Sequence, residues 1–105
     1  MSFAEFQQSV GRDAAPPATA GSALQALWHS AHQQNKRGWD HAHQLVQDDP
    51  SADSAWAHAY LHRKEGDASN AAYWYMRAGR PKPAAATTLE TEWAEMVATL
   101  LATGR

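Results

Sequence analysis

Six histidines occur in this chain of 105 residues, and two of them, His58 and His62, lie four residues apart with Glu65 three residues further on. In a helix this spacing places the three side chains along one side. Two imidazoles one turn apart can bind a divalent metal ion, and a carboxylate can complete a set of two histidines and one carboxylate. We therefore predict His58, His62 and Glu65 as candidate metal ligands, with His43 as a further one. The zinc-protease helix motif is not present, because Ala59 and not glutamate follows the first histidine.

Aromatic side chains accompany these histidines and suggest a second chemistry that needs no metal. Imidazole groups titrate near neutral pH, so a buried set can serve as acid and base or bind a small anion. Aromatic rings can hold a peptide or a small ligand by stacking. The candidate binding residues of such a groove are His43, His58, His62, Tyr75, Trp39, Trp56, Trp74 and Arg77. The competing interpretation is that the same rings only pack a narrow core between alanine-lined helices.

A small basic cluster, Arg77, Arg80 and Lys82, follows the last of these aromatic residues. Cations near the C-terminal end of a helix complement its dipole, and the same cluster is able to contact a phosphate or an acidic peptide. The formal net charge of the chain is −2, so we expect no nucleic-acid partner and no membrane surface. Cysteine is absent, which excludes disulfides and sulfur-ligated metal and agrees with the cytoplasmic location that we expect.

Helices must position these residues, because no segment keeps the period-two alternation of a strand. Apolar residues recur every three or four positions instead. The predicted helices cover residues 22–35, 38–48, 51–64, 67–78 and 87–101. Turn and capping residues separate them, among them Gly66 and the capping box formed by Thr87 and Glu90. We therefore predict an all-α domain over residues 22–105, a five-helix right-handed array of antiparallel helix hairpins.

Residues 1–21 are predicted as a flexible N-terminal arm and linker. Phe3, Phe6 and Val10 have the spacing of a short amphipathic turn, and residues 11–21 are rich in alanine, proline and glycine. Either the arm docks its phenylalanines on the domain or on a second copy of the chain, or it is a frayed terminus.

One predicted hairpin, residues 55–83, carries a repeat pattern of small, aromatic and proline residues. Its positions are Ala59, Gly66, Ala71, Tyr75, Ala78 and Pro83. This spacing resembles the tetratricopeptide repeat and its bacterial Sel-like relatives. The departure lies in the first helix, where the usual large residue of the family falls on Ala55 or is displaced to Trp56. The resemblance implies stacked helix hairpins.

Longer strings resemble a family of small bacterial proteins of unknown function that has longer fungal relatives. They are HAYLHRKEGD at 58–67, NAAYWYMRAGRP at 70–81 and WDHAH at 39–43. That family has no established activity, so this resemblance supports a tetratricopeptide-like fold and implies no reaction.

Our leading functional hypothesis is a noncatalytic binding module. The first, third and fifth predicted helices would present a groove to a peptide, a partner protein or a small ligand. The last helix has a wide apolar stripe, which favours a homodimer through Trp93, Met96, Val97, Leu100 and Leu101. No phosphate loop, nucleophile elbow or dinucleotide fingerprint is present. We therefore favour binding over catalysis and expect no cofactor beyond a divalent metal ion.

The alternative is a small metal-binding protein or enzyme centred on His43, His58, His62 and Glu65. It requires at least three of these groups to converge around one point. It fails if His58 and His62 each donate a hydrogen bond to a backbone carbonyl in a dry core. A third hypothesis is a pH-responsive fold, because protonation of buried neutral imidazoles destabilises the native state as pH falls.

Overall fold

The computed structural model describes residues 1–103, so the last two residues of the predicted 22–105 domain lie outside the described part. Within residues 1–103 the chain forms six α-helices and no strand, which confirms the all-helical prediction. Their bounds are α1 Phe3–Arg12, α2 Ser22–His32, α3 Lys36–Val46, α4 Ala52–Glu65, α5 Ala68–Ala78 and α6 Leu89–Ala102. The number exceeds the predicted five because the N-terminal arm forms a regular helix of its own.

Besides the capping box that starts α1, capping side chains mark where four further helices begin. The N-cap residues Asn35, Ser51, Asp67 and Thr88 each accept a hydrogen bond from the backbone N–H three residues later. Such a bond satisfies one of the donors that a helix N-terminus leaves without an intrahelical partner. The cap of α6 is thus Thr88, one residue later than the predicted capping box, because its hydroxyl accepts from the Thr91 N–H.

Two glycines in the left-handed conformation end α4 and α5. Gly66 and Gly79 have φ angles of +90° and +68°, which residues with a side chain rarely adopt. After α4, the Gly66 N–H bonds to the Arg63 carbonyl and the next N–H bonds to the His62 carbonyl. This pair of hydrogen bonds satisfies the last carbonyls of the helix. The turn and capping role predicted for Gly66 is therefore confirmed.

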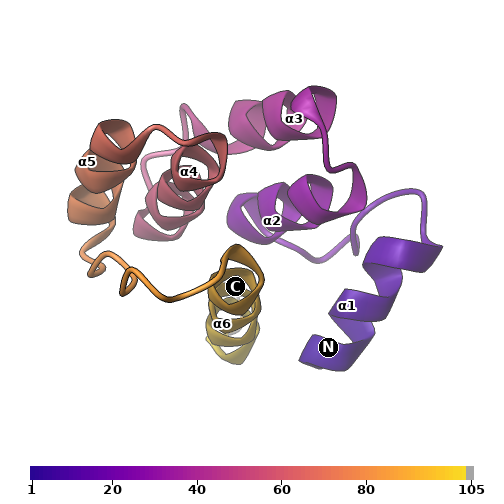
Figure 1. Ribbon diagram of the computed structural model, residues 1–105. Helices are drawn as coiled ribbons and strands as arrows, with labels where there is room; N and C mark the ends of the chain where they lie inside the picture. Colours follow the sequence, from indigo (N-terminus) through magenta and orange to yellow (C-terminus); the bar gives the residue numbers. More distant parts are fainter. Residues whose placement is uncertain (104–105) are drawn as a thin grey trace.

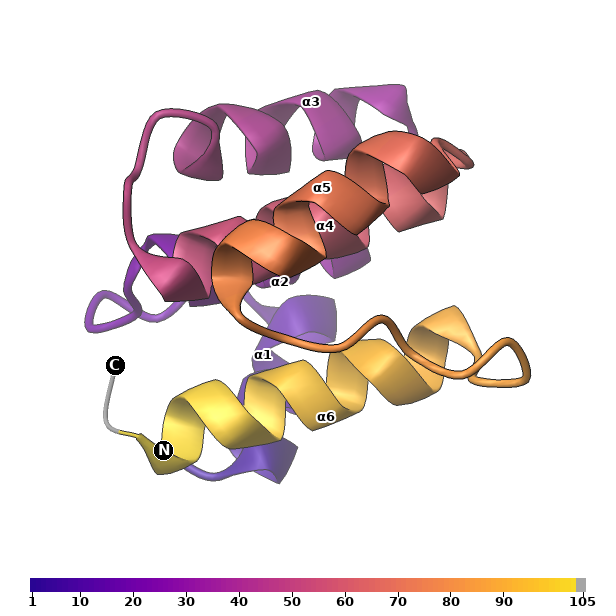
Figure 2. The ribbon, with the colours of Figure 1, turned by 90° about the vertical axis from the view of Figure 1, so that its left-hand side faces the viewer.

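Helix α4 is the central element of the fold. It contacts α2, α3, α5 and α6, and residues 54–62 are buried one after another along it. Figure 1 shows α3 beside α2 and α5 beside α4, with α1 and α6 together below them. In the turned view of Figure 2, α3 lies at the top and α6 near the bottom, with α2, α4 and α5 between them. Among the described helices, none combines the length and apolar character that a membrane crossing needs.

The N-terminal helix α1 packs on the domain against α2 and α6. Phe6 is fully buried, and its ring centroid lies 6.1 Å from that of Trp93, with the ring of Phe3 at 6.0 Å from the same indole. Ser9 accepts a hydrogen bond of 3.0 Å from the indole N–H of Trp28. The phenylalanines of the arm therefore dock on the domain of their own chain.

The apolar stripe of α6 is covered within the same chain. Met96, Val97 and Leu100 are buried, and Leu101 is half-buried. Trp93 is buried as well and donates a hydrogen bond of 2.8 Å to the Leu27 carbonyl on α2. The stripe on which the predicted homodimer depends thus packs against α1, α2 and α4 and does not lie open.

Candidate functional site

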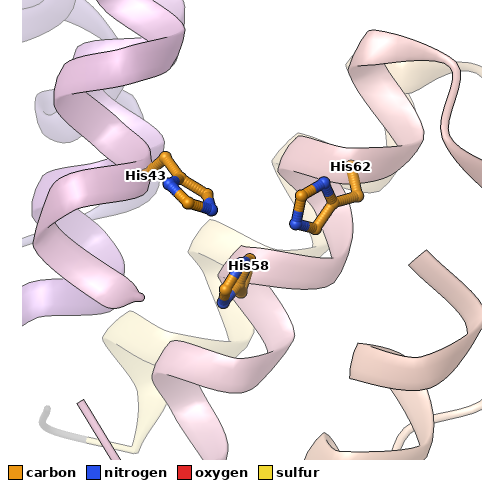
Figure 3. Close-up of side chains that lie close together, drawn as sticks. All are labelled: His43, His58 and His62. Atoms are coloured by element: carbon orange, nitrogen blue, oxygen red, sulfur yellow. The ribbon is translucent and has the colours of Figure 1, made fainter. Parts of the chain in front are cut away.

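Three of the predicted site histidines converge between α3 and α4. His43 extends from α3, and His58 and His62 extend from successive turns of α4, so that the three rings face one another (Figure 3). One ring nitrogen of each lies within 4.8 Å of the other two. The ring centroids are 4.6 Å apart for His43 and His58, 5.4 Å for His43 and His62, and 4.8 Å for His58 and His62. The four-residue spacing on α4 therefore supplies two members of the cluster, and packing of α3 supplies the third.

A tight connection before α3 fixes where His43 lies. The Asn35 side chain caps α3 by accepting from the Gly38 N–H at 3.1 Å. Gly38 is buried, and a Cβ placed on it would lie only 1.8 Å from the carbonyl oxygen of Gln33. The end of α2 and the first turn of α3 approach this closely only because position 38 has no side chain. This approach sets the position of α3 and of the histidine it carries.

Glu65 lies on the other side of His62 from the cluster. Its Oε2 is 2.7 Å from Nδ1 of His62, which leaves Nε2 of that ring for His43 and His58. Among the described residues, the second group with ligand atoms mutually within 4.8 Å is His62, Glu65 and Asp67. The predicted combination of His58, His62 and Glu65 is therefore not brought to one point. His58 stacks against the face of the His62 ring, whereas the carboxylate lies at Nδ1 on its edge.

Two indoles flank the histidine cluster. Trp39 stacks on His43, with centroids 4.8 Å apart and an interplanar angle of 12°, and its N–H donates to the Leu61 carbonyl at 2.7 Å. Trp74 stacks on His58 at 3.9 Å and 19°. The guanidinium of Arg77 lies 5.4 Å from the Trp74 ring. The histidines, these two indoles and Arg77 thus form one continuous cluster across α3, α4 and α5.

The environment keeps His58 and His43 neutral. Burial, followed by the nearby His43 and His62, lowers the pKa of His58 from 6.5 to about 4. Burial also lowers the pKa of His43, with a further contribution from His62. The Nδ1 atom of His58 is buried and has no hydrogen-bond partner among the described residues. Neutral imidazoles have a nitrogen lone pair, so these rings are in the state that ligates a metal.

Two other predicted residues, Tyr75 and Trp56, face α6 and the segment before it. Tyr75 donates to Oε2 of the buried Glu92 at 2.5 Å, and Arg63 donates to Oε1 of the same carboxylate at 3.0 Å. Trp56 lies under the guanidinium of Arg80, which is 4.0 Å from the ring centroid. Neither side chain therefore belongs to the histidine cluster. No pattern in the sequence indicated that Glu92 is buried, since a charged residue near the start of a helix is usually exposed.

The predicted groove between the first, third and fifth helices corresponds to a hollow of about 190 Å³ between α2, α4 and α6. Helix α1 also borders it, through Gln7. The lining residues are Gln7, Ala31, Gln34, Tyr60, Lys64, Leu89, Glu90, Trp93 and Ala94. None of the three clustered histidines lines it, so the groove and the cluster are separate features. A second hollow of about 350 Å³ lies beside Trp39 and Glu65.

The arrangement as a whole offers three converging imidazoles, a carboxylate at the second ring nitrogen of one of them and two flanking indoles. No protein-family model matches this chain, and comparison with curated proteins and with solved structures likewise found no match.

Proposed function

We propose that this chain binds a divalent transition-metal ion through His43, His58 and His62. The observation that carries the proposal is the convergence of three imidazole nitrogens within 4.8 Å of one another. Nitrogen ligands of a tetrahedral ion, at metal–nitrogen distances of about 2.0–2.1 Å, lie about 3.3 Å apart. The three nitrogens need to approach by about 1.5 Å at most, and rotation of the side chains would have to supply this movement.

The carboxylate of Glu65 supports this role from outside the ligand set. Metal-bound histidines commonly donate their second ring N–H to a carboxylate, which fixes the tautomer and orients the ring. The contact of 2.7 Å between Nδ1 of His62 and Glu65 has this form. It places the proton on Nδ1 and the lone pair on Nε2, the nitrogen that faces the cluster.

Packing alone explains the cluster less well. The indole N–H groups of Trp28, Trp39 and Trp93 all have partners, as buried polar groups usually do. The buried Nδ1 of His58 has none among the described residues, a state it shares with the Ser54 hydroxyl. A buried polar atom without a partner costs about 1–3 kcal/mol. The partner of His62 among the described residues is the Glu65 carboxylate at Nδ1 and not a backbone carbonyl.

The ligand chemistry favours zinc and neighbouring transition metals. Imidazole nitrogen suits Zn²⁺, Co²⁺, Ni²⁺ and Cu²⁺, whereas Mg²⁺ and Ca²⁺ prefer oxygen ligands. The chain has no cysteine, so thiolate sites and iron–sulfur clusters are not available to it.

The test is calorimetric titration of Zn²⁺ into untagged, metal-free protein, together with elemental analysis of the protein as purified. We expect one ion per chain. His43→Gln should lower the association constant by more than about 100-fold. Loss of a residue that only hydrogen-bonds a metal ligand lowers affinity by up to about 100-fold, and loss of a ligand should cost more. His41→Gln is the matched control, because His41 is exposed on the same helix and stacks on His29, 3.9 Å away. Equal affinity in both variants and the wild type would show that the cluster is not the binding site.

A second candidate is the binding module with a groove between α2, α4 and α6. The hollow of about 190 Å³ between these helices favours it, since Trp93 and Lys64 offer apolar and charged contacts there. In this proposal the pairs α2–α3 and α4–α5 are tetratricopeptide-like units, supported by the buried Ala59 and Ala71. Peptides selected from a displayed library should bind the wild type and lose binding to Ala94→Arg, which fills the hollow. Retained binding would place their site elsewhere.

A further inference from the structure

The histidine cluster supplies three ligands to a metal ion and no fourth. Among the described residues, the group around His43, His58 and His62 contains no additional histidine or carboxylate within 4.8 Å of all three. Glu65, the nearest carboxylate in sequence, is held at Nδ1 of His62, on the edge of the ring that faces away from the other two. Zinc and cobalt ions take at least four ligands. A ligand from outside the protein must therefore complete the coordination.

Access to this remaining position is narrow. His58 and His62 have only 3% and 6% of their surface exposed, whereas His43 is half-buried and reaches solvent. Trp39 and Trp74 cover one face of His43 and one face of His58, and both indoles are themselves half-buried. A ligand therefore approaches past the edge of His43. The indoles restrict it to a small group that offers one donor atom.

The charge of the site favours an anion over a neutral ligand. Imidazole ligands carry no negative charge, so the full double charge of the ion stays uncompensated by His43, His58 and His62. Arg77 adds a cation against Trp74 on the α5 side. The carboxylates of Glu65, Asp40 and Asp48 oppose this field at His43. Glu65 and Asp48 are exposed to solvent, and the half-buried Asp40 is paired with Lys36. Water screens an exposed charge much more than a buried one.

From these observations we infer that the metal ion keeps one exchangeable coordination position, which binds small monodentate anions in competition with water. The inference rests on the metal site proposed above and extends it from a binding site for an ion to a binding site for an anionic ligand. The arrangement of three protein ligands and one exchangeable position is the one in which bound zinc acts on other molecules, whereas purely structural zinc has four protein ligands.

The test uses the full chain loaded with one equivalent of Co²⁺, whose visible absorption reports its coordination. Sodium azide is titrated into the loaded protein, and the matched variants His41→Gln and His43→Gln are treated in the same way. We expect azide to change the cobalt bands along a saturable curve in the wild type and in His41→Gln. We also expect the apparent affinity for azide to fall at higher pH, because hydroxide competes for the same position.

The possible outcomes separate the two proposals. In one outcome, cobalt bands appear in the wild type and weaken in His43→Gln, but a large excess of azide leaves them unchanged. This result would overturn the exchangeable position and leave the proposed metal site standing. Cobalt bands that do not appear, or that are equally strong in His43→Gln, would overturn the metal site and this inference with it. A saturable azide response in the wild type that His43→Gln abolishes supports both.

Discussion

Gly38→Ala tests the close approach that places α3, and its expected effect is opposite to that of an ordinary glycine-to-alanine change in a helix. The added Cβ would lie 1.8 Å from the Gln33 carbonyl oxygen and 2.8 Å from the carbonyl carbon. Both atoms belong to the backbone, so no side-chain rotation relieves the overlap. Either the end of α2 or the first turn of α3 has to move.

The size of the effect follows from what that movement breaks. Alanine in place of a helical glycine stabilises by about 0.5–1 kcal/mol. Against this, the movement disrupts the Asn35 cap on the Gly38 N–H and the hydrogen bond from the Asn35 N–H to the Gln33 carbonyl. Each is worth about 1 kcal/mol, and residual backbone strain costs about 1 kcal/mol more. We expect Gly38→Ala to lower the free energy of unfolding by about 2 kcal/mol.

Gly11→Ala is the matched control, because Gly11 also lies in a helix and nothing lies within 4 Å of its added Cβ. Urea unfolding followed by far-ultraviolet circular dichroism measures both variants. Gly11→Ala should be as stable as the wild type or slightly more so, and Gly38→Ala should unfold roughly 10 °C lower in a thermal scan. The Zn²⁺ affinity of folded Gly38→Ala should also fall, since α3 carries His43. If Gly38→Ala matches Gly11→Ala in stability, the close approach and the reasoning built on it are wrong.

Three further predictions concern the cluster and the N-terminal helix. In metal-free protein, the pKa of His58 is about 4 in the fold and about 6.5 in the unfolded chain, so its contribution to stability is complete above pH 6.5 and is lost as pH falls toward 4. Urea titrations should show that the free energy of unfolding falls by about 2 kcal/mol between about pH 7 and pH 5. This loss should be smaller in His58→Gln, and an equal loss in that variant would contradict the prediction. Glu65→Gln should weaken Zn²⁺ binding about 10–100-fold in calorimetric titrations, and unaltered affinity would remove Glu65 from the site. Phe6→Ala should destabilise by about 3 kcal/mol, more than Phe3→Ala because only Phe6 is fully buried, and equal unfolding midpoints for the two variants would show that α1 docks differently.

Local patterns in the sequence predict most of the helices because caps and glycine ends act over a few residues. Ser51, Asp67 and Gly66 mark the limits of α4 and the start of α5 within the chain segment itself. The docked helix α1 was harder to foresee. Its short apolar stripe is separated from the domain by a proline-rich segment, and the burial of Phe6 depends on α2 and α6, which come later in the chain.

The site was partly predictable for a related reason. The spacing of His58 and His62 defines one face of a helix, and this part of the cluster needs no tertiary information. The sequence could not predict toward which neighbouring helix Trp56 and Tyr75 point. Residues 54–62 of α4 are buried on every side, so periodicity cannot distinguish the face toward α3 from the face toward α6. Only the packing places Tyr75 against Glu92 and leaves it apart from the histidines.

Because α4 is central to the fold, the three histidines of the cluster differ in how readily they can be substituted during evolution. His58 and His62 belong to the most enclosed stretch of the chain, where a replacement disturbs contacts with several helices at once. His43 is half-buried on α3 and reaches solvent, so a replacement there disturbs fewer buried contacts than one at His58 or His62. A lineage can therefore lose or regain the third of the proposed ligands through a change at one codon. Variation at position 43 among related sequences would then separate members that hold an ion from members that keep only the scaffold.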